Sequence, residues 1–264
     1  MRRLLSTFVL SGALVACGIS QQQEMQLGQQ ASMDINRQLP MVNDPTVNSY
    51  VTQLGNRIAS HGQRGLNYRF FVVNSDVVNA FAVPGGYVYV NRGLIERAGN
   101  MSELAGVLAH EISHVELRHS VQQMEKAQGA NAAVTLGSVL LGQPSSVGAA
   151  AINVAGTAVF AKFSRDDENE ADANAIPLMI ATGINPNGLT TMFQRLISLQ
   201  KSQPNAVTQF FSTHPASQER VNQTQARINQ VPAAQRRNLT TDATQFHTIQ
   251  SRLRSMSPAP RSNQ

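Results

Sequence analysis

The chain has little cysteine and little charge. Cys17 is the only cysteine among 264 residues, so no disulfide can form within the chain. Stability has to come from core burial and from a bound metal. Charged residues make up 14% of the chain, and the formal net charge of +5 includes Arg2 and Arg3. No basic stripe is interleaved with aromatic residues, so we expect no nucleic acid among the partners.

A long apolar run is also missing, which argues against an ordinary membrane-spanning helix. The apolar stretch from Leu4 to Val15 follows two arginines and is typical of a signal peptide. It runs into Leu14-Val15-Ala16-Cys17, which is typical of a bacterial lipobox, with cleavage before Cys17 and a lipid on its sulfur. We therefore predict a signal peptide over 1–16 and a membrane anchor at Cys17; the alternative is a plain secretory signal. Gly18 after the anchor favours the outer membrane of the bacterial envelope.

The length of the chain suits a single domain, which we place at residues 31–254, between a predicted tether and a predicted tail. Gln21 to Gln23 indicate a solvated tether over 17–30, and prolines and serines predict a disordered tail over 255–264. The stretch from Ala130 to Phe163 is rich in glycine, alanine and valine, and we predict two packed helices there, joined by a turn. A membrane hairpin over Val147 to Phe163 is the alternative.

The most informative motif is His110-Glu111-Ile112-Ser113-His114, within an apolar-periodic stretch that Asn100 can cap. Histidines four residues apart lie on one face of a helix, so both rings can reach a single zinc ion. Glu111 lies beside them and can take a proton from the attacking water. A chance match on a solvated helix is the alternative, but the apolar stripe places this helix in a core.

A catalytic zinc site needs a third protein ligand and an open position. The metzincin pattern fails, because Leu117 and Ser120 occupy its glycine and histidine positions. Glu168 and Asp172 lie one helical turn apart further along the chain, so Glu168 can bind the metal while Asp172 hydrogen-bonds a ligand histidine. Glu170 is expected to point elsewhere on that helix. An acidic, solvated helix start explains the same residues, and this alternative stays open.

Two β-branched and aromatic runs, Tyr68 to Asn74 and Tyr87 to Asn91, predict strands. Pro84-Gly85-Gly86 interrupts the pattern between them and allows a tight turn. An ordinary hairpin in a small sheet accounts for this composition.

In four blocks together the chain resembles the gluzincin family that includes the CAAX-prenyl proteases and the heat-shock protease HtpX, and most closely its soluble periplasmic lipoprotein branch. The resemblance extends from about Gln23 to Arg227. The blocks are Asn79 to Val90, Glu103 to His119, Ser164 to Asp172, and His214-Pro215 followed by Arg220. The implied fold is α+β: a mainly helical, zincin-like metalloprotease domain with a small β-sheet beside the active-site helix.

The resemblance also implies roles for individual residues. One zinc ion per chain would be held by His110, His114 and Glu168, with Glu111 as the base and Asp172 behind a ligand. Substrate would pair as an added strand along an edge at Gly86, Tyr87 and Val88. His214 and Arg220 would lie by the metal. Arg220 would stabilise negative charge on the tetrahedral intermediate.

His214 has two candidate roles that the sequence leaves open. It either donates a hydrogen bond to the substrate oxyanion or occupies the open zinc position in a resting state. A surface histidine is the third alternative. We assign no metal role to His119, which a continuous helix would turn away from His114, or to His61 and His247.

The expected function is a zinc-dependent endopeptidase of the bacterial envelope, acting on unfolded or misassembled proteins from the periplasmic face of the membrane. Two alternatives remain. One is a lipid-anchored chaperone that binds unfolded strands without cutting, although binding alone needs no general base such as Glu111. The other is a self-inhibited protease that needs activation.

Overall fold

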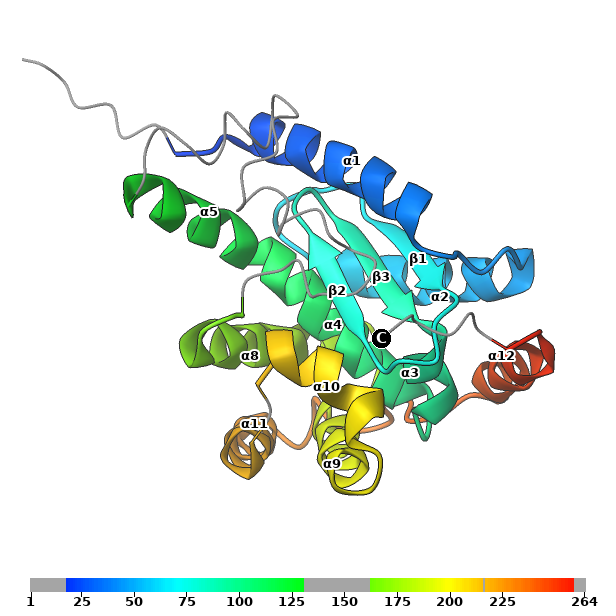
Figure 1. Ribbon diagram of the computed structural model, residues 1–264. Helices are drawn as coiled ribbons and strands as arrows, with labels where there is room; N and C mark the ends of the chain where they lie inside the picture. Colours follow the sequence, from blue (N-terminus) through cyan, green and yellow to red (C-terminus); the bar gives the residue numbers. More distant parts are fainter. Residues whose placement is uncertain (1–17, 131–161, 216, 259–264) are drawn as a thin grey trace, which may run out of the picture.

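A computed structural model describes residues 18–130, 162–215 and 217–258 of the chain. The helices and strands of its first half, in chain order, are α1 (Gln21–Gln38), α2 (Pro45–Ala59), β1 (Arg69–Val73), β2 (Ala80–Val83), β3 (Tyr87–Asn91), α3 (Arg92–Arg97), α4 (Met101–Glu116) and α5 (His119–Ala130). The helices of its second half are α8 (Arg165–Ala181), α9 (Asn187–Ser202), α10 (Pro204–Thr213), α11 (Gln218–Gln230) and α12 (Thr244–Ser255). The prediction of a mainly helical α+β domain with a small sheet is confirmed (Figure 1).

The sheet has three strands in the order β1-β3-β2. β3 is parallel to β1 and antiparallel to β2, and Tyr89 is paired with Phe71 on one side and Phe81 on the other. Gly85 and Gly86 turn the chain between β2 and β3 with φ of 79° and 94°, a region that favours glycine. The predicted strands appear as β1 and β3. The strand β2 was not predicted, because its four residues are all buried and show no polar-apolar alternation.

This topology corrects the prediction of a substrate-binding edge at Gly86, Tyr87 and Val88. β3 is the central strand, so Tyr87 and Val88 are paired with a strand on either side. The carbonyl of Gly86 accepts the amide of Arg69 at 2.8 Å. The prediction is wrong because the parallel partner β1 takes the side of β3 that an added strand would need.

Both faces of the sheet are covered. Val88 and Val90 pack into the main core with α4, whereas Phe81 and Tyr89 pack on the opposite face with Ile35 of α1. Side chains alternate along a strand, so each strand contributes to both apolar clusters. Figure 1 shows α1 along one side of the sheet and α4 on the other.

Helix α4 lies in the middle of the molecule, with all its residues from Met101 to Val115 buried. The side chain of Asn100 caps it by accepting the amide of Glu103 at 3.1 Å, as predicted. Helix α9 packs directly against it, because a side chain on Gly188 would overlap the backbone of Ser102. The motif therefore sits on a helix that core packing holds on several sides.

Helix α1 overturns the prediction of a solvated tether over 17–30, as far as its described residues go. Ser20 and Gln23 form a capping box, and the helix buries Glu24 and Gly28 against the sheet. A side chain on Gly28 would overlap the carbonyl oxygen of Pro84, so the contact is backbone to backbone. The glutamines that look like a linker occupy the exposed face of this helix.

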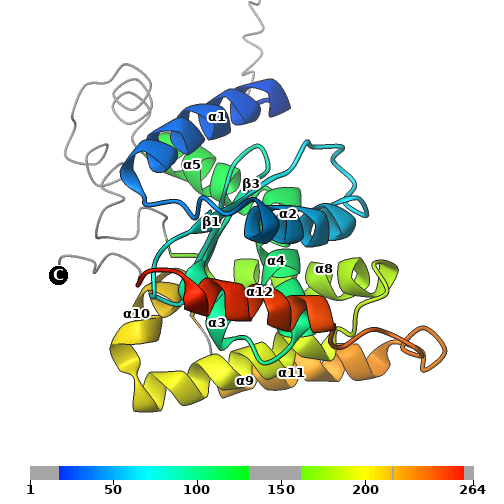
Figure 2. The same cartoon turned by 90° about the vertical axis from the view of Figure 1, so that its right-hand side faces the viewer.

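The C-terminal helix α12 lies along α2 and α3 (Figure 2). The buried amide of Gln250 donates to the carbonyls of Ile95 and Ala98 at 2.9 and 2.7 Å. Arg92 donates to the carbonyl of Ser257 at 2.7 Å, so ordered contacts extend into the predicted disordered tail. Residues 259–264 of that tail lie outside the described part.

Three further predictions concern residues outside the described part. They are the signal peptide over 1–16, the lipidation of Cys17, and nearly all of the predicted helix pair between Ala130 and Phe163. Among the residues that the structure does describe, no helix combines the length and apolar character needed to cross a membrane.

Candidate metal centre

The two motif histidines project from one face of α4 into the interior. The Nε2 atoms of His110 and His114 are 3.0 Å apart, and their rings meet edge to face at 85°. Both side chains are buried. The one-turn spacing thus gives the convergence that two ligands of one ion require.

Helix α8 brings a carboxylate to these rings. Its N-terminus is fixed by a capping box between Ser164 and Asp167, which leaves Glu168 in the first turn facing α4. Glu168 Oε1 lies 3.3 Å from His114 Nε2, and its Oε2 lies 3.6 Å from His110 Nε2. Glu168 is buried, so the alternative of an acidic, solvated helix start does not hold for this residue.

His214 follows α10 and completes the cluster. Its Nδ1 lies 2.8 Å from Glu168 Oε1 and 3.3 Å from His110 Nε2. One donor atom from each of the four residues lies within 4.8 Å of the others, and all four side chains are buried. Histidine nitrogens and one carboxylate are the donor set of catalytic zinc sites, so the cluster fits such an ion.

Glu111 adds an acidic group without a full set of partners. Its side chain is buried, and its Oε1 has no hydrogen-bond partner among the described residues. The nearest cation candidate is His214, whose Nε2 lies 3.4 Å away. A buried unpaired carboxylate oxygen is costly, so its presence points to a ligand or water at this position.

The charge balance of the cluster sets the pKa values of its members. Burial and the neighbouring His110 hold the pKa of His114 well below its usual range, which favours the neutral, metal-binding ring. Burial raises the pKa of Glu168, but His214 and Arg220 outweigh it and keep the group ionised. Burial lowers the pKa of His214, and Glu168 and Glu111 outweigh this so that the net shift is upward.

Behind the cluster, Asp172 and Arg220 form a buried ion pair. Arg220 Nε and Nη2 lie 2.6 and 2.7 Å from the two carboxylate oxygens of Asp172, and Oδ1 of Asp172 lies 2.9 Å from His110 Nδ1. Despite burial, which raises it, the pKa of Asp172 falls to about 2, chiefly because of Arg220. Arg220 also pairs with Glu168 and stacks 4.4 Å above the ring of Phe193.

These contacts bear on the predicted role of Arg220. Its guanidinium is shared between Asp172, Glu168 and the carbonyl of Pro215. The geometry therefore favours a support for the carboxylates over a direct contact with a reaction intermediate.

Two residues at the centre were not expected there from the sequence. Phe163 stacks on His114 with ring centroids 3.9 Å apart, and no local sequence signal marks it. His119, predicted to turn away, lies with its Nδ1 2.8 Å from His114 Nδ1. That prediction is wrong because α4 ends at Glu116 and Arg118 adopts a φ of 59°, which breaks the helix before His119.

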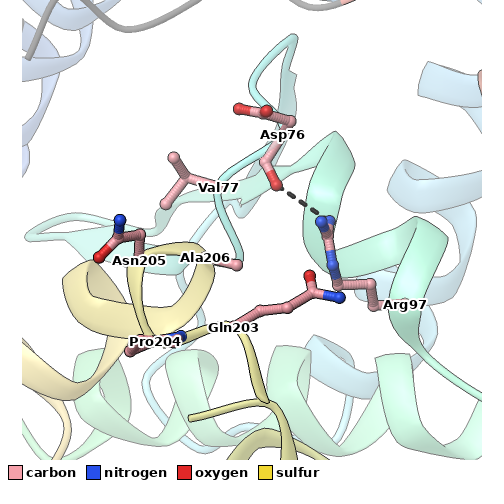
Figure 3. A pocket seen from close by; sticks show the side chains of 7 residues that line it. All are labelled: Asp76, Val77, Arg97, Gln203, Pro204, Asn205 and Ala206. Atoms are coloured by element: carbon pink, nitrogen blue, oxygen red, sulfur yellow. Dashed lines mark hydrogen bonds between the residues drawn. The ribbon is translucent and has the colours of Figure 1, made fainter. Parts of the chain in front are cut away.

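A pocket of about 370 Å³ lies elsewhere, where the β1–β2 loop meets the start of α10. Its polar lining includes Asp76, Arg97 and Gln203, and Arg97 donates to the carbonyl of Asp76 at 3.0 Å (Figure 3). No member of the buried cluster lines it, so it is separate from the candidate metal centre.

The sequence of the chain matches a known protein family and several known proteins. Peptidase family M48 matches residues 44–228. The chain is 35% identical over 218 residues to the beta-barrel assembly-enhancing protease of Escherichia coli (strain K12), which covers 79% of this chain and 44% of that protein. It is 33% identical over 177 residues to metalloprotease LoiP of the same organism, covering 67% of each chain.

A more distant relative is the mitochondrial metalloendopeptidase OMA1 of Schizosaccharomyces pombe, 30% identical over 187 residues, with 70% of this chain and 54% of that protein covered. The chain spans less than half the length of the beta-barrel assembly-enhancing proteases that it matches.

Proposed function

Because the chain belongs to peptidase family M48, we propose that it is a zinc endopeptidase whose metal is held by His110, His114 and Glu168. The observation that carries the proposal is the buried cluster itself: two histidines and a carboxylate converge beside an unpaired oxygen of Glu111. Three protein ligands of this kind, with one further position for water or substrate, are the arrangement of catalytic zinc. One ion per chain follows from the one cluster found in the described residues.

In this proposal each residue of the site has a separate role. Bound zinc would polarise the scissile carbonyl and make water more acidic. Glu111, buried beside the cluster, accepts the proton of the attacking water and returns it to the leaving amine. Asp172 accepts from Nδ1 of His110 at 2.9 Å and so directs Nε2 into the cluster. Arg220 holds Asp172 and Glu168 as anions.

His214 fits the resting-state cap better than the oxyanion donor. Its Nδ1 lies among the ligand atoms, 2.8 Å from Glu168 Oε1, where it would compete with water and substrate for the metal. We propose that the protein is in this sense self-inhibited, and that α10 and the following residue have to move before cleavage.

If His214 caps the metal at rest, its removal should raise the cleavage rate, whereas removal of a catalytic residue would lower it. His214→Ala should raise the basal rate of casein cleavage, because the open metal position becomes accessible. His247→Ala, on the surface helix α12, serves as the control. A fall of roughly 10²–10³ would instead show an oxyanion donor. An unchanged rate would exclude both roles.

The substrates that we propose are unfolded or misassembled proteins of the bacterial envelope. This rests on the relative named beta-barrel assembly-enhancing protease and on the lipobox at Cys17. The chain would be anchored at the periplasmic face of the outer membrane by a lipid on that cysteine.

The anchor can be tested in cells. Cys17→Ser should release the processed protein from the membrane fraction, because one thiol carries the whole attachment. Fractionation has to be done on protein whose signal peptide is gone, as verified by N-terminal sequencing. Processed Cys17→Ser protein that stays with the membranes would rule out lipidation as the anchor.

A further inference from the structure

His114 presents its two ring nitrogens to different neighbours. Nε2 lies inside the cluster, 3.0 Å from His110 Nε2 and 3.3 Å from Glu168 Oε1. Nδ1 is on the other side of the ring, 2.8 Å from Nδ1 of His119. Nε2 is therefore the atom that would bind the metal, and Nδ1 is the atom through which the protein supports the ring.

The contact continues from His119 towards solvent. The ring of His119 is fully buried, and its Nε2 lies 3.4 Å from Oε2 of Glu170. The side chain of Glu170 is 65% exposed. Three side chains thus form a line from the candidate metal centre to the surface of α8.

The hydrogen bonds along this line have one consistent direction. A ring nitrogen that binds a metal offers its lone pair, so the proton of His114 resides on Nδ1. Only one of two nitrogens 2.8 Å apart can donate, so His119 accepts at its Nδ1. A neutral His119 then carries its proton on Nε2, which faces the carboxylate of Glu170. Every donor meets an acceptor.

The backbone at Arg118 makes this arrangement available. Its φ of 59° lies in the left-handed region, which is unfavourable for a non-glycine residue. The guanidinium of Arg118 donates to Glu24 at 3.0 Å and also to the carbonyl of Ile19. Contacts with the N-terminal segment therefore hold the turn from which His119 reaches back to His114.

We propose that His119 and Glu170 are positioning residues that fix the ring of His114 for metal binding, an inference that rests on the proposed zinc site. His110 receives the equivalent support directly from Asp172, at 2.9 Å. For His114 the support is indirect, because the ring of His119 lies between His114 and the carboxylate of Glu170. Loss of such an outer partner lowers metal affinity by roughly 10–100-fold.

The test measures the dissociation constant for Zn²⁺ in the full-length processed protein, by competition with a chromophoric chelator. His119→Leu should weaken Zn²⁺ binding by roughly 10–100-fold, because Nδ1 of His114 loses its acceptor. His119→Asn should bind almost as tightly as wild type, since its amide oxygen can replace the accepting nitrogen. Unchanged affinity in His119→Leu, or equal losses in both variants, would overturn the proposal, because packing alone would then account for the residue.

Glu170→Ala keeps the proposal testable if His119→Leu fails to fold, because Glu170 is exposed. It should weaken Zn²⁺ binding by about tenfold, the lower end of the range for outer partners. Asp166→Ala, which removes an exposed carboxylate one turn earlier in α8, is the matched control. Equal affinities for the two variants would overturn the role of Glu170. A wild-type protein that binds no Zn²⁺ would overturn the proposed function instead.

Discussion

Glu111→Gln should lower the rate of casein hydrolysis at least about 100-fold while the protein keeps one zinc ion per chain. Glutamine has nearly the shape of glutamate but cannot accept the proton of the attacking water. General-base catalysis contributes about 10²–10⁴-fold to rate, so the loss should be of that size. The fold should persist, because Oε1 of Glu111 makes no hydrogen bond within the described structure that the change would break. Cleavage of labelled casein and metal analysis of the same preparation measure the two effects.

The control is Glu219→Gln, which makes the same chemical change on the exposed surface of α11 and should leave the rate unchanged. A Glu111→Gln variant that cleaves normally would exclude the proposed base. A wild-type protein that binds unfolded chains but shows no cleavage, even with His214→Ala, would favour the chaperone alternative.

The second large effect is expected for Glu168→Ala, which should lose both zinc and activity. Removal of the carboxylate leaves two histidine ligands, and it strips the buried Arg220 of one of its two anionic partners. Glu168→Gln should retain more zinc than Glu168→Ala, since its amide oxygen can still face the metal. Metal content after dialysis against a weak chelator should decrease in the order wild type, Glu168→Gln, Glu168→Ala.

Asp166→Ala again provides the control, because it lies in the first turn of α8 but is exposed. Circular dichroism shows whether α8 still forms. Full zinc content in folded Glu168→Ala would mean that His214 or another group is the third ligand, and would displace Glu168 from the proposed site.

The parts of the site that could be predicted are those encoded within one turn of a helix. The spacing of His110 and His114 fixes their convergence once the stretch is helical, and Asn100 marks where that helix starts. The same holds for Glu168 and Asp172 on α8, which face the two histidines as expected.

The parts that failed depend on residues distant in sequence. Whether β3 is an edge depends on which strand pairs with it, and its parallel partner β1 comes earlier in the chain. Helix α1 looks like a polar linker because its buried acid, Glu24, has partners far along the chain in Arg64 and Arg118. The break before His119 is at an arginine in the left-handed region, and neither glycine nor proline announces it.

The burial of α4 on all sides has a consequence for how the metal would leave. Amide hydrogens in the most enclosed helix of a domain exchange with solvent only when the whole domain opens, whereas helix ends fray at little cost. His110 belongs to the first class, whereas Glu168 lies in the first turn of α8, where the capping box of Ser164 and Asp167 and the ion pair with Arg220 oppose fraying. The bound ion would then leave only when this turn opens against those contacts. A chelator should therefore empty the site slowly, while His110 stays in place on the buried helix to receive the next ion.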